Sequence, residues 1–216
     1  MRVVLIAAKQ LAFAKTRLIP VLPDADERMA VAKAMFRDVL SAALAARVPE
    51  RVAVVTSDPA LIALAHSTGA TVIDEEYPRG LNVAVRLATA ELASLGATSV
   101  CTLLSDIPLV TGEDIDAAFA AMPAAGPAVV LVPSRDFSGT NMMVRRPPEV
   151  IATQFGRLSL VRHLDDCRTR AIACQVVRLD RPALDLDLPG DLQELERMRS
   201  LTHTQTHLAR LGLSHG

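Results

Sequence analysis

The stretch Val100–Ser105 reads VCTLLS, is followed by Asp106, and decides the fold class of this chain. A short, continuous apolar run is typical of a strand that is buried on both faces of a parallel sheet. We therefore expect a central strand here. Open α/β sheets bind their ligands outside the carboxyl ends of the strands, where Asp106 is expected to lie. The ordinary alternative is a turn, because Asp106 begins an Asp-Ile-Pro sequence.

Outward from this run, strand-like and helix-like segments alternate along the chain. The expected strands are Arg2–Ala8, Val52–Thr56, Ala70–Ile73, Thr98–Ser105, Ala128–Pro133, Ser138–Val144 and Ala171–Arg178, the last one antiparallel at an edge. The expected helices are Asp24–Ala46, Asp58–His66, Gly80–Leu95, Gly112–Met122, Pro147–Phe155, Ser159–Thr169 and Pro189–Leu201. This alternation predicts an α/β fold, a mostly parallel open sheet with helices on both faces. Residues 1–216 are expected to form a single domain, with a core of 1–201 and a tail of 202–216 that either extends the last helix or frays.

Composition limits the partners. The 216 residues carry 23 Lys and Arg against 24 Asp and Glu, and only 3% are aromatic, so neither a basic footprint nor a stacking platform for nucleic acid is expected. The three cysteines show no disulfide or metal-ligand spacing, which fits a reduced, cytoplasmic setting. The apolar stretch Val3–Ala8 is too short for a membrane span. The Ala-rich helices leave room for a homodimer.

A second acidic feature is the pair Asp185 and Asp187, in the segment Leu184–Asp187. Side chains alternate along an extended chain, so both carboxylates are expected on one side of it. Brought near Asp106, they would form a hard, all-oxygen site that suits Mg²⁺ holding a nucleotide phosphate. Taken alone, the pair is equally well read as surface charge near the start of the last helix.

The loop after the first strand, Lys9–Leu18, contains no glycine. It therefore matches neither the dinucleotide-binding fingerprint nor a P-loop. It does place Lys9, Lys15 and Arg17 at the carboxyl edge of the first strand. Lys offers a compact charge to a phosphate and Arg can grip two phosphate oxygens together. The alternative is a solvated basic loop, but three charges at the ligand-binding edge favour the functional interpretation.

Four positions elsewhere have both a structural and a functional interpretation. Thr140, in Gly139–Asn141, follows a strand and fits an ordinary turn. Ser159 is a plausible helix N-cap, but a helix start preceded by Gly156 also offers N–H groups and a hydroxyl to an anion. His163 lies one helical turn after Ser159 and is more often structural in such a position. Asn82, beside Gly80, either caps a helix or contacts a nucleotide.

Six motifs now stand in one order. They are A-K-x-R-L after the first strand, G-L-N before a helix, S-D-I-P-L, G-T-N, F-G-x-x-S with a His four residues on, and L-D-x-D-x-P-x-D-L. Over roughly Val3 to Leu195 this order resembles the 2-phospho-L-lactate guanylyltransferase family of coenzyme F420 biosynthesis, which includes the phosphoenolpyruvate guanylyltransferases. The chain lacks the glycine-rich loop of the related molybdenum cofactor guanylyltransferases, which favours the F420 branch.

The resemblance implies a compact, Rossmann-like fold related to the GT-A nucleotidyltransferases. It implies that Thr140, Gly156 and Ser159 bind a phosphorylated acid and that Asp106, Asp185 and Asp187 hold Mg²⁺. We assign Lys9, Lys15, Arg17 and Asn82 to GTP, and Lys15, Arg17 and Asp106 to catalysis. Two positions depart from the family pattern, Leu160 where Phe is usual and Phe137-Ser138 where small residues are usual.

The expected reaction is therefore transfer of GMP from GTP to 2-phospho-L-lactate or phosphoenolpyruvate, with release of pyrophosphate. No Ser-His-Asp or Cys-His arrangement is expected, because an ionised phosphate needs no general base to attack. Two alternatives stay open. One is the same chemistry on 3-phosphoglycerate, a sugar phosphate or molybdopterin, and the other is a non-catalytic nucleotide-binding regulatory module.

Overall fold

The structure, a computed structural model, describes residues 1–75, 77–198 and 200–213. The strands are β1 (Arg2–Ala7), β2 (Arg51–Thr56), β3 (Thr71–Asp74), β4 (Ser99–Leu104), β5 (Ala128–Pro133), β6 (Thr140–Arg146) and β7 (Ala173–Val176). The helices are α1 (Ala25–Ala45), α2 (Pro59–Ser67), α3 (Leu81–Ser94), α4 (Gly112–Ala120), α5 (Ser159–Thr169), α6 (Asp180–Ala183), α7 (Pro189–Arg197) and α8 (His203–Arg210). Two short 3₁₀ helices, Leu11–Phe13 and Thr16–Leu18, lie in the loop after β1.

One sheet of seven strands organises the described residues, in the order β3-β2-β1-β4-β6-β5-β7. The pairs β1–β2, β1–β4, β2–β3 and β5–β7 are parallel, whereas β6 is antiparallel to both β4 and β5. The α/β fold and the central place of β4 are therefore confirmed. Because β6 runs against its neighbours, its first residue, Thr140, lies at the edge where the parallel strands end.

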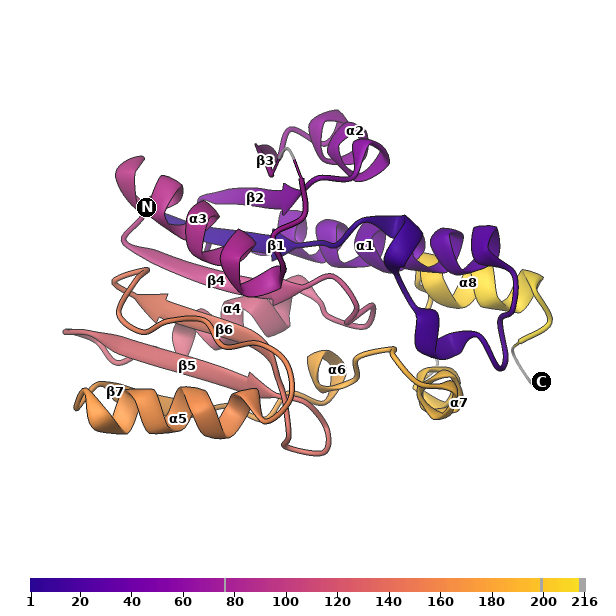
Figure 1. Cartoon of the computed structure of the whole chain (residues 1–216). Helices are drawn as coiled ribbons and strands as arrows, with labels where there is room; N and C mark the ends of the chain where they lie inside the picture. Colours follow the sequence, from indigo (N-terminus) through magenta and orange to yellow (C-terminus); the bar gives the residue numbers. More distant parts are fainter. Residues whose placement is uncertain (76, 199, 214–216) are drawn as a thin grey trace.

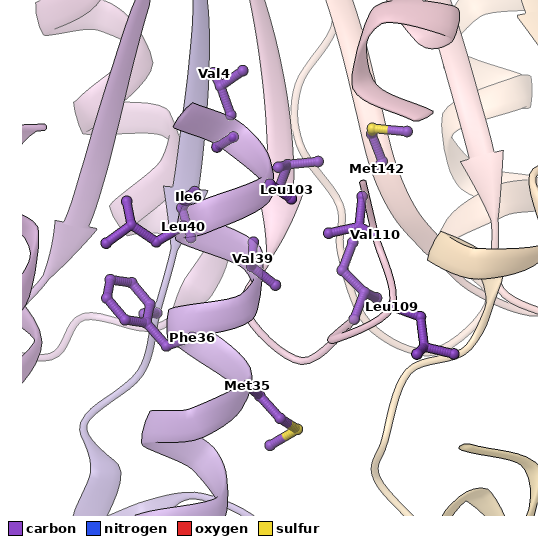
Figure 2. Packing of buried hydrophobic residues seen from close by; sticks show 14 of the residues in the cluster. Val4, Ile6, Met35, Phe36, Val39, Leu40, Leu103, Leu109, Val110 and Met142 are labelled. Atoms are coloured by element: carbon purple, nitrogen blue, oxygen red, sulfur yellow. The ribbon is translucent and has the colours of Figure 1, made fainter. Parts of the chain in front are cut away.

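Helices cover both faces of the sheet (Figure 1). Alternate residues of β1 enter the two cores, with Val4 and Ile6 on the side of α1 and Val3 and Leu5 on the side of α3. Figure 2 shows Met35, Phe36, Val39 and Leu40 of α1 packed near Val4, Ile6 and Leu103. These side chains are 1% exposed or less. Burying one such side chain stabilises the fold by roughly 1.5–3 kcal/mol, so the sheet is a rigid support for the loops at its edge.

Residues 147–155 are not helical, so the helix expected over Pro147–Phe155 is wrong. The Pro147-Pro148 pair disfavours a helical start, because the residue before a proline is pushed out of the α region. Backbone N–H groups that a helix would use are instead bound by side chains. The Gln154 N–H donates to His163 Nε2 (2.9 Å) and the Phe155 N–H donates to Asn82 Oδ1 (2.7 Å).

The edge strand β7 is parallel to β5, which corrects the expected antiparallel pairing. The reason is the path of the chain. Helix α5 starts beside Thr140, at the edge where the parallel strands end, and carries the chain back to the opposite edge. A strand that follows such a crossover runs parallel to its neighbour.

The C-terminal region also differs from expectation, because the last predicted helix is shorter than expected and the tail forms a separate helix. Helix α7 ends at Arg197 rather than Leu201, and α8 begins after Thr202, whose side chain accepts a hydrogen bond from the Gln205 N–H. The Asp38 carboxylate of α1 accepts from the N–H groups of His203 and Thr204, which docks α8 on the core. The tail is thus helical over His203–Arg210, and its last three residues, 214–216, lie outside the described residues. No described helix has the combined length and hydropathy that crossing a membrane requires.

Candidate active site

Three adjoining cavities lie at the edge where the parallel strands end. The first, of about 260 Å³, is lined by the basic loop, Asp106 and Asp187. The second, of about 180 Å³, lies on the side of β2 and α3, and the third, of about 710 Å³, lies on the side of β6 and α5. Lys9 borders all three cavities, and Arg17 borders the first and the third. A ligand with three chemically distinct parts can therefore lie along this edge.

The basic loop is held in place at its beginning. The Asp58 carboxylate caps α2 and also accepts a hydrogen bond from the Leu11 N–H (2.9 Å), which joins the loop to the end of β2. Lys15 then adopts a left-handed backbone conformation with φ 56°. This conformation is uncommon for a long side chain, and strain of this kind clusters at functional sites.

Lys15 and Arg17 reach acidic residues that are distant in the sequence. Lys15 Nζ lies 3.1 Å from Asp106 Oδ2 and 3.5 Å from Asp187 Oδ1, and Arg17 lies 2.9 Å from Asp187 Oδ2. The Lys15 side chain is 7% exposed, whereas that of Arg17 is 69% exposed. Burial alone would lower the pKa of Lys15, but the charges of Asp106 and Asp187 outweigh it and raise that pKa above its ordinary value. Lys15 is therefore a fixed cation at the centre of the edge.

The segment that carries Asp185 and Asp187 is extended, as the alternation predicts. The Leu186 N–H donates to the Asp106 carbonyl (2.9 Å), so the segment pairs with the chain just after β4. Leu184 and Leu186 point into the core, and the two carboxylates face the cavities. Asp106, Asp185 and Asp187 therefore lie at the same edge of the sheet, where the parallel strands end, as the sequence predicts.

The carboxylates nevertheless do not form a closed cage. In the part of the chain that the structure describes, no three His, Cys, Asp or Glu side chains converge as a metal-binding group. Lys15 Nζ instead lies between Asp106 and Asp187. Asp106 Oδ1 is buried and has no hydrogen-bond partner among the described residues. Burial, and next the charge of Asp106, raise the pKa of Asp185. This end of the site thus has negative charge that the protein does not fully compensate.

On the side of β6 and α5, three predicted residues come together. Thr140, Gly156 and Ser159 all line the third cavity. Ser159 is the first residue of α5 and not its N-cap, and its hydroxyl accepts a hydrogen bond from the Thr140 N–H (2.8 Å). Gly156 has φ 115°, and a Cβ built there would come no closer than 3.9 Å to any protein atom outside its chain neighbours. The glycine is therefore required by its backbone conformation rather than by crowding from the protein.

The buried side chain of His163 holds Thr140 and the loop before α5 in place. Its ring is fully buried, and its Nε2 atom accepts from the Gln154 N–H, so in the neutral ring the proton is on Nδ1. Nδ1 lies 3.0 Å from Thr140 Oγ1 and donates to it, which leaves the Thr140 hydroxyl proton for another acceptor. Burial, and next the charges of Arg145 and Arg162, lower the pKa of His163 to about 4. The ring is thus a neutral, fixed support for Thr140.

Asn82 has a different place from the one expected. Its amide pairs with the backbone of Phe155, donating to the carbonyl oxygen (3.0 Å) and accepting from the N–H (2.7 Å). It does not line any of the three cavities. Asn82 therefore ties α3 to the loop that carries Gly156, and a direct nucleotide contact is not what this geometry provides.

Of the residues that depart from the family pattern, Leu160 and Phe137 do not line the third cavity. Leu160 is 6% exposed and packs in the core beneath α5. The ring of Phe137 lies under the Arg178 guanidinium, 4.6 Å from its carbon atom, and only Ser138 lines the cavity. Their bearing on the acceptor is therefore smaller than the sequence suggests.

Two positioning residues were missed from the sequence. Asn141 is 3% exposed, and its amide nitrogen donates to Asp185 Oδ1 (3.2 Å) and to the carbonyl oxygens of Pro182 and Ala183. Asp191 accepts from the N–H of Asp187 (2.9 Å), which fixes the backbone at the second carboxylate. Their positions in the G-T-N and D-x-D-x-P-x-D motifs were the available signals.

The fold and the site together define a nucleotidyltransferase-like protein. Its backbone superimposes on that of a candidate nucleotide-diphospho-sugar transferase from Desulfovibrio desulfuricans with a TM-score of 0.77 at 17% identity, covering 97% of this chain and 94% of that one. A cytidylyltransferase from Leptospira borgpetersenii gives a TM-score of 0.63 at 12% identity, covering 100% and 97%. These similarities establish the fold.

The family follows from the sequence comparison. Residues 1–215 match the family of CofC-like guanylyl transferases, and the chain belongs to it. It is 35% identical over 193 residues to a phosphoenolpyruvate guanylyltransferase of Sphaerobacter thermophilus, covering 89% of this chain and 91% of the relative. It is 38% identical over 187 residues to a 3-phospho-D-glycerate guanylyltransferase of Phenylobacterium zucineum (85% and 84%), and 31% identical over 207 residues to a 2-phospho-L-lactate guanylyltransferase of Methanothermobacter thermautotrophicus (96% and 89%). The resemblance seen in the sequence is thus confirmed.

Proposed function

We propose that this protein transfers GMP from GTP to the phosphate of a small phosphorylated carboxylic acid, 2-phospho-L-lactate or phosphoenolpyruvate, in coenzyme F420 biosynthesis. The observation that carries the proposal is the row of three adjoining cavities, with Lys15, Arg17 and Asp106 at its centre. A nucleoside triphosphate and an acceptor acid need such a row. The base, the triphosphate and the acid would occupy the second, first and third cavities.

In the reaction, an oxygen of the acceptor phosphate attacks the α-phosphorus of GTP, and the bond from that phosphorus to the pyrophosphate oxygen breaks. Phosphoryl-type transfers of this kind ask the protein mainly for alignment and charge neutralisation. Lys15 and Arg17 now face carboxylates and would exchange them for oxygens of the leaving pyrophosphate. The attacking phosphate is ionised at neutral pH, so the protein need not remove a proton from it.

The residues present fit Mg²⁺. Asp106 keeps a buried oxygen that has no partner in the part of the chain that the structure describes, and Asp185 lies close enough for the charge of Asp106 to raise its pKa. Mg²⁺ is usually held by one or two carboxylates together with substrate phosphates, so a complete protein cage is not required. Asp106, Asp185 and Asp187 would hold the ion, which when bound neutralises charge on the triphosphate.

The acceptor would be held by the third cavity. The Thr140 hydroxyl has a proton available, and the start of α5 offers the N–H groups of an eleven-residue helix to an anion. Arg135 and Arg157 also line this cavity and add positive charge for a phosphate or a carboxylate. Relatives named for three different acids share this chain's family, so the choice among them requires a direct assay.

The test is a pyrophosphate-release assay with GTP and Mg²⁺ against phosphoenolpyruvate, 2-phospho-L-lactate and 3-phosphoglycerate. We expect release with one of the first two acids. Release with only 3-phosphoglycerate, or with only a sugar phosphate, would replace the acceptor. GTP binding without pyrophosphate release with any of these acceptors would contradict the proposal and support the non-catalytic regulatory module.

A further inference from the structure

The second cavity is more apolar in character than its neighbours, and Glu75 is the one acidic residue among those that line it. It lies at the carboxyl ends of β1 and β2 and beside the start of α3, and its walls include Val55, Phe13 and Leu81. Phe13 and Leu81 also line the first cavity, so the two spaces share a wall. At about 180 Å³ the second cavity is smaller than a typical site for a whole drug-sized ligand, which spans roughly 300–1,000 Å³. It suits one ring system of a larger ligand.

Glu75 directly follows β3, and the residue lines this cavity. Glu75 Oε1 is buried and has no hydrogen-bond partner among the described residues. The Glu75 N–H donates to the Thr56 carbonyl (3.4 Å), which holds the residue at the end of β2. A buried polar atom without a partner is costly, so an unsatisfied carboxylate oxygen on a residue that lines a cavity indicates that a ligand supplies the missing donor.

We propose that Glu75 recognises the guanine base, an inference that rests on the proposed function and names the residue that selects its nucleotide. The Watson–Crick edge of guanine presents two adjacent donors, the N1–H and the exocyclic amino group. A carboxylate has two acceptor oxygens and no donor, so it pairs with both. Adenine presents the lone pair of N1 at the same place, which a carboxylate repels. Selection would thus combine an attraction to guanine with a repulsion of adenine.

Two neighbouring side chains complete the base site. Phe13 is 69% exposed and lines both cavities, so its ring is free to stack on a base whose phosphates extend toward Lys15. Lys9 borders the same wall and lies between the base and the triphosphate. Burial raises the pKa of Glu75, while the backbone and charge of Arg79 oppose the rise. Hydrogen bonds that a base donates to the carboxylate would favour its charged form.

The test is a calorimetric titration of the full chain with GTP, ITP and ATP in the presence of Mg²⁺, without any acceptor acid. ITP matches GTP except that it lacks the exocyclic amino group. We expect the wild type to bind GTP more tightly than ITP, and ITP more tightly than ATP. In Glu75→Gln the GTP affinity should fall by roughly 5- to 150-fold, which corresponds to about 1–3 kcal/mol for a lost bidentate contact, and the GTP-to-ITP ratio should approach one.

Glu91→Gln is the matched control, because it removes the same charge from an exposed position of α3. Its nucleotide affinities should equal those of the wild type. Glu75→Ala provides a second variant, and far-UV circular dichroism checks that both Glu75 variants are folded. Wild-type ratios among GTP, ITP and ATP in either folded variant would overturn the inference. Because no acceptor is present, this failure is separate from a failure of the transferase proposal, which would appear as absent pyrophosphate release.

Discussion

At the end of the site that we propose for the nucleotide (the nucleotide end), Lys15 and Arg17 form ion pairs with Asp106 and Asp187. At the end proposed for the acceptor (the acceptor end), Thr140 is held by hydrogen bonds among buried groups. An ion pair can exchange a carboxylate for a phosphate at little cost, because both partners stay charged. A buried hydrogen bond is costly to leave unmade. The nucleotide end is therefore suited to exchanging ion-pair partners during the reaction. The acceptor end is suited to keeping its residues in one fixed conformation.

The strongest test of this difference is Asp106→Asn. Asp106 contacts Lys15, and its Oδ1 atom is buried without a hydrogen-bond partner among the described residues, so removing its charge should disturb both Lys15 and the binding of the proposed Mg²⁺. Loss of a group that stabilises transition-state charge costs about 3 kcal/mol or more, so turnover should fall by roughly 100-fold or more. Steady-state pyrophosphate release at saturating Mg²⁺ measures this effect. Asp165→Asn, at an exposed position of α5, is the control, and near-normal turnover in Asp106→Asn would remove Asp106 from the reaction.

The next largest effect is expected from Gly156→Val at the acceptor end. A β-branched residue at φ 115° is a backbone outlier, and strain of this kind costs of order 1–3 kcal/mol. The loop that lines the third cavity should shift, so acceptor use should be nearly abolished while GTP binding survives. Gly126→Val imposes comparable strain in the turn before β5, far from the cavities, and should lower stability without changing the acceptor KM. Equal acceptor KM values in the two variants would show that the Gly156 loop does not shape the site.

The next prediction concerns stability rather than turnover, and it involves the buried support of Thr140. The pKa of His163 is lowered to about 4, from an ordinary value of 6.5, so between these pH values the unfolded chain binds the proton that the folded protein excludes. The stability that His163 contributes is fully present above pH 6.5 and is lost as the pH falls toward 4. The loss is roughly 3 kcal/mol, because each pKa unit corresponds to about 1.4 kcal/mol.

In His163→Gln this part of the pH dependence should disappear. Urea unfolding at several values between pH 4 and 7 measures it, and the slope of the free energy of unfolding against pH is the quantity to compare. An unchanged slope would mean that the buried ring does not titrate as this environment requires.

Much of the site could be predicted because strand ends are readable in a sequence. Asp106 follows an apolar run, and the basic loop follows the first strand, so both had to lie at one edge. The alternation in Leu184–Asp187 placed Asp185 and Asp187 on one side of the chain, as the structure has them. Thr140 also reached this edge, although the reversal of β6 that brings it there was not predicted.

What could not be predicted depends on contacts between distant residues. The segment Pro147–Phe155 looked helical because its backbone N–H partners, His163 and Asn82, cannot be inferred from local spacing. The same contact uses the Asn82 amide, which does not line any of the three cavities. The pairing of Lys15 with Asp106 joins residues 91 positions apart, and the direction of β7 depends on where α5 begins.

The most direct test of the two-ended site is a pair of ligand titrations on Ser159→Ala and Lys15→Ala. In Ser159→Ala the buried Thr140 N–H loses its acceptor, so affinity for the phosphorylated acid should fall by roughly tenfold, as expected for about 1.4 kcal/mol, and GTP affinity should be unchanged. In Lys15→Ala the reverse is expected, with GTP affinity weakened and acid affinity nearly unchanged. Ser159→Ala that loses GTP but keeps the phosphorylated acid would contradict the assignment of the two ends.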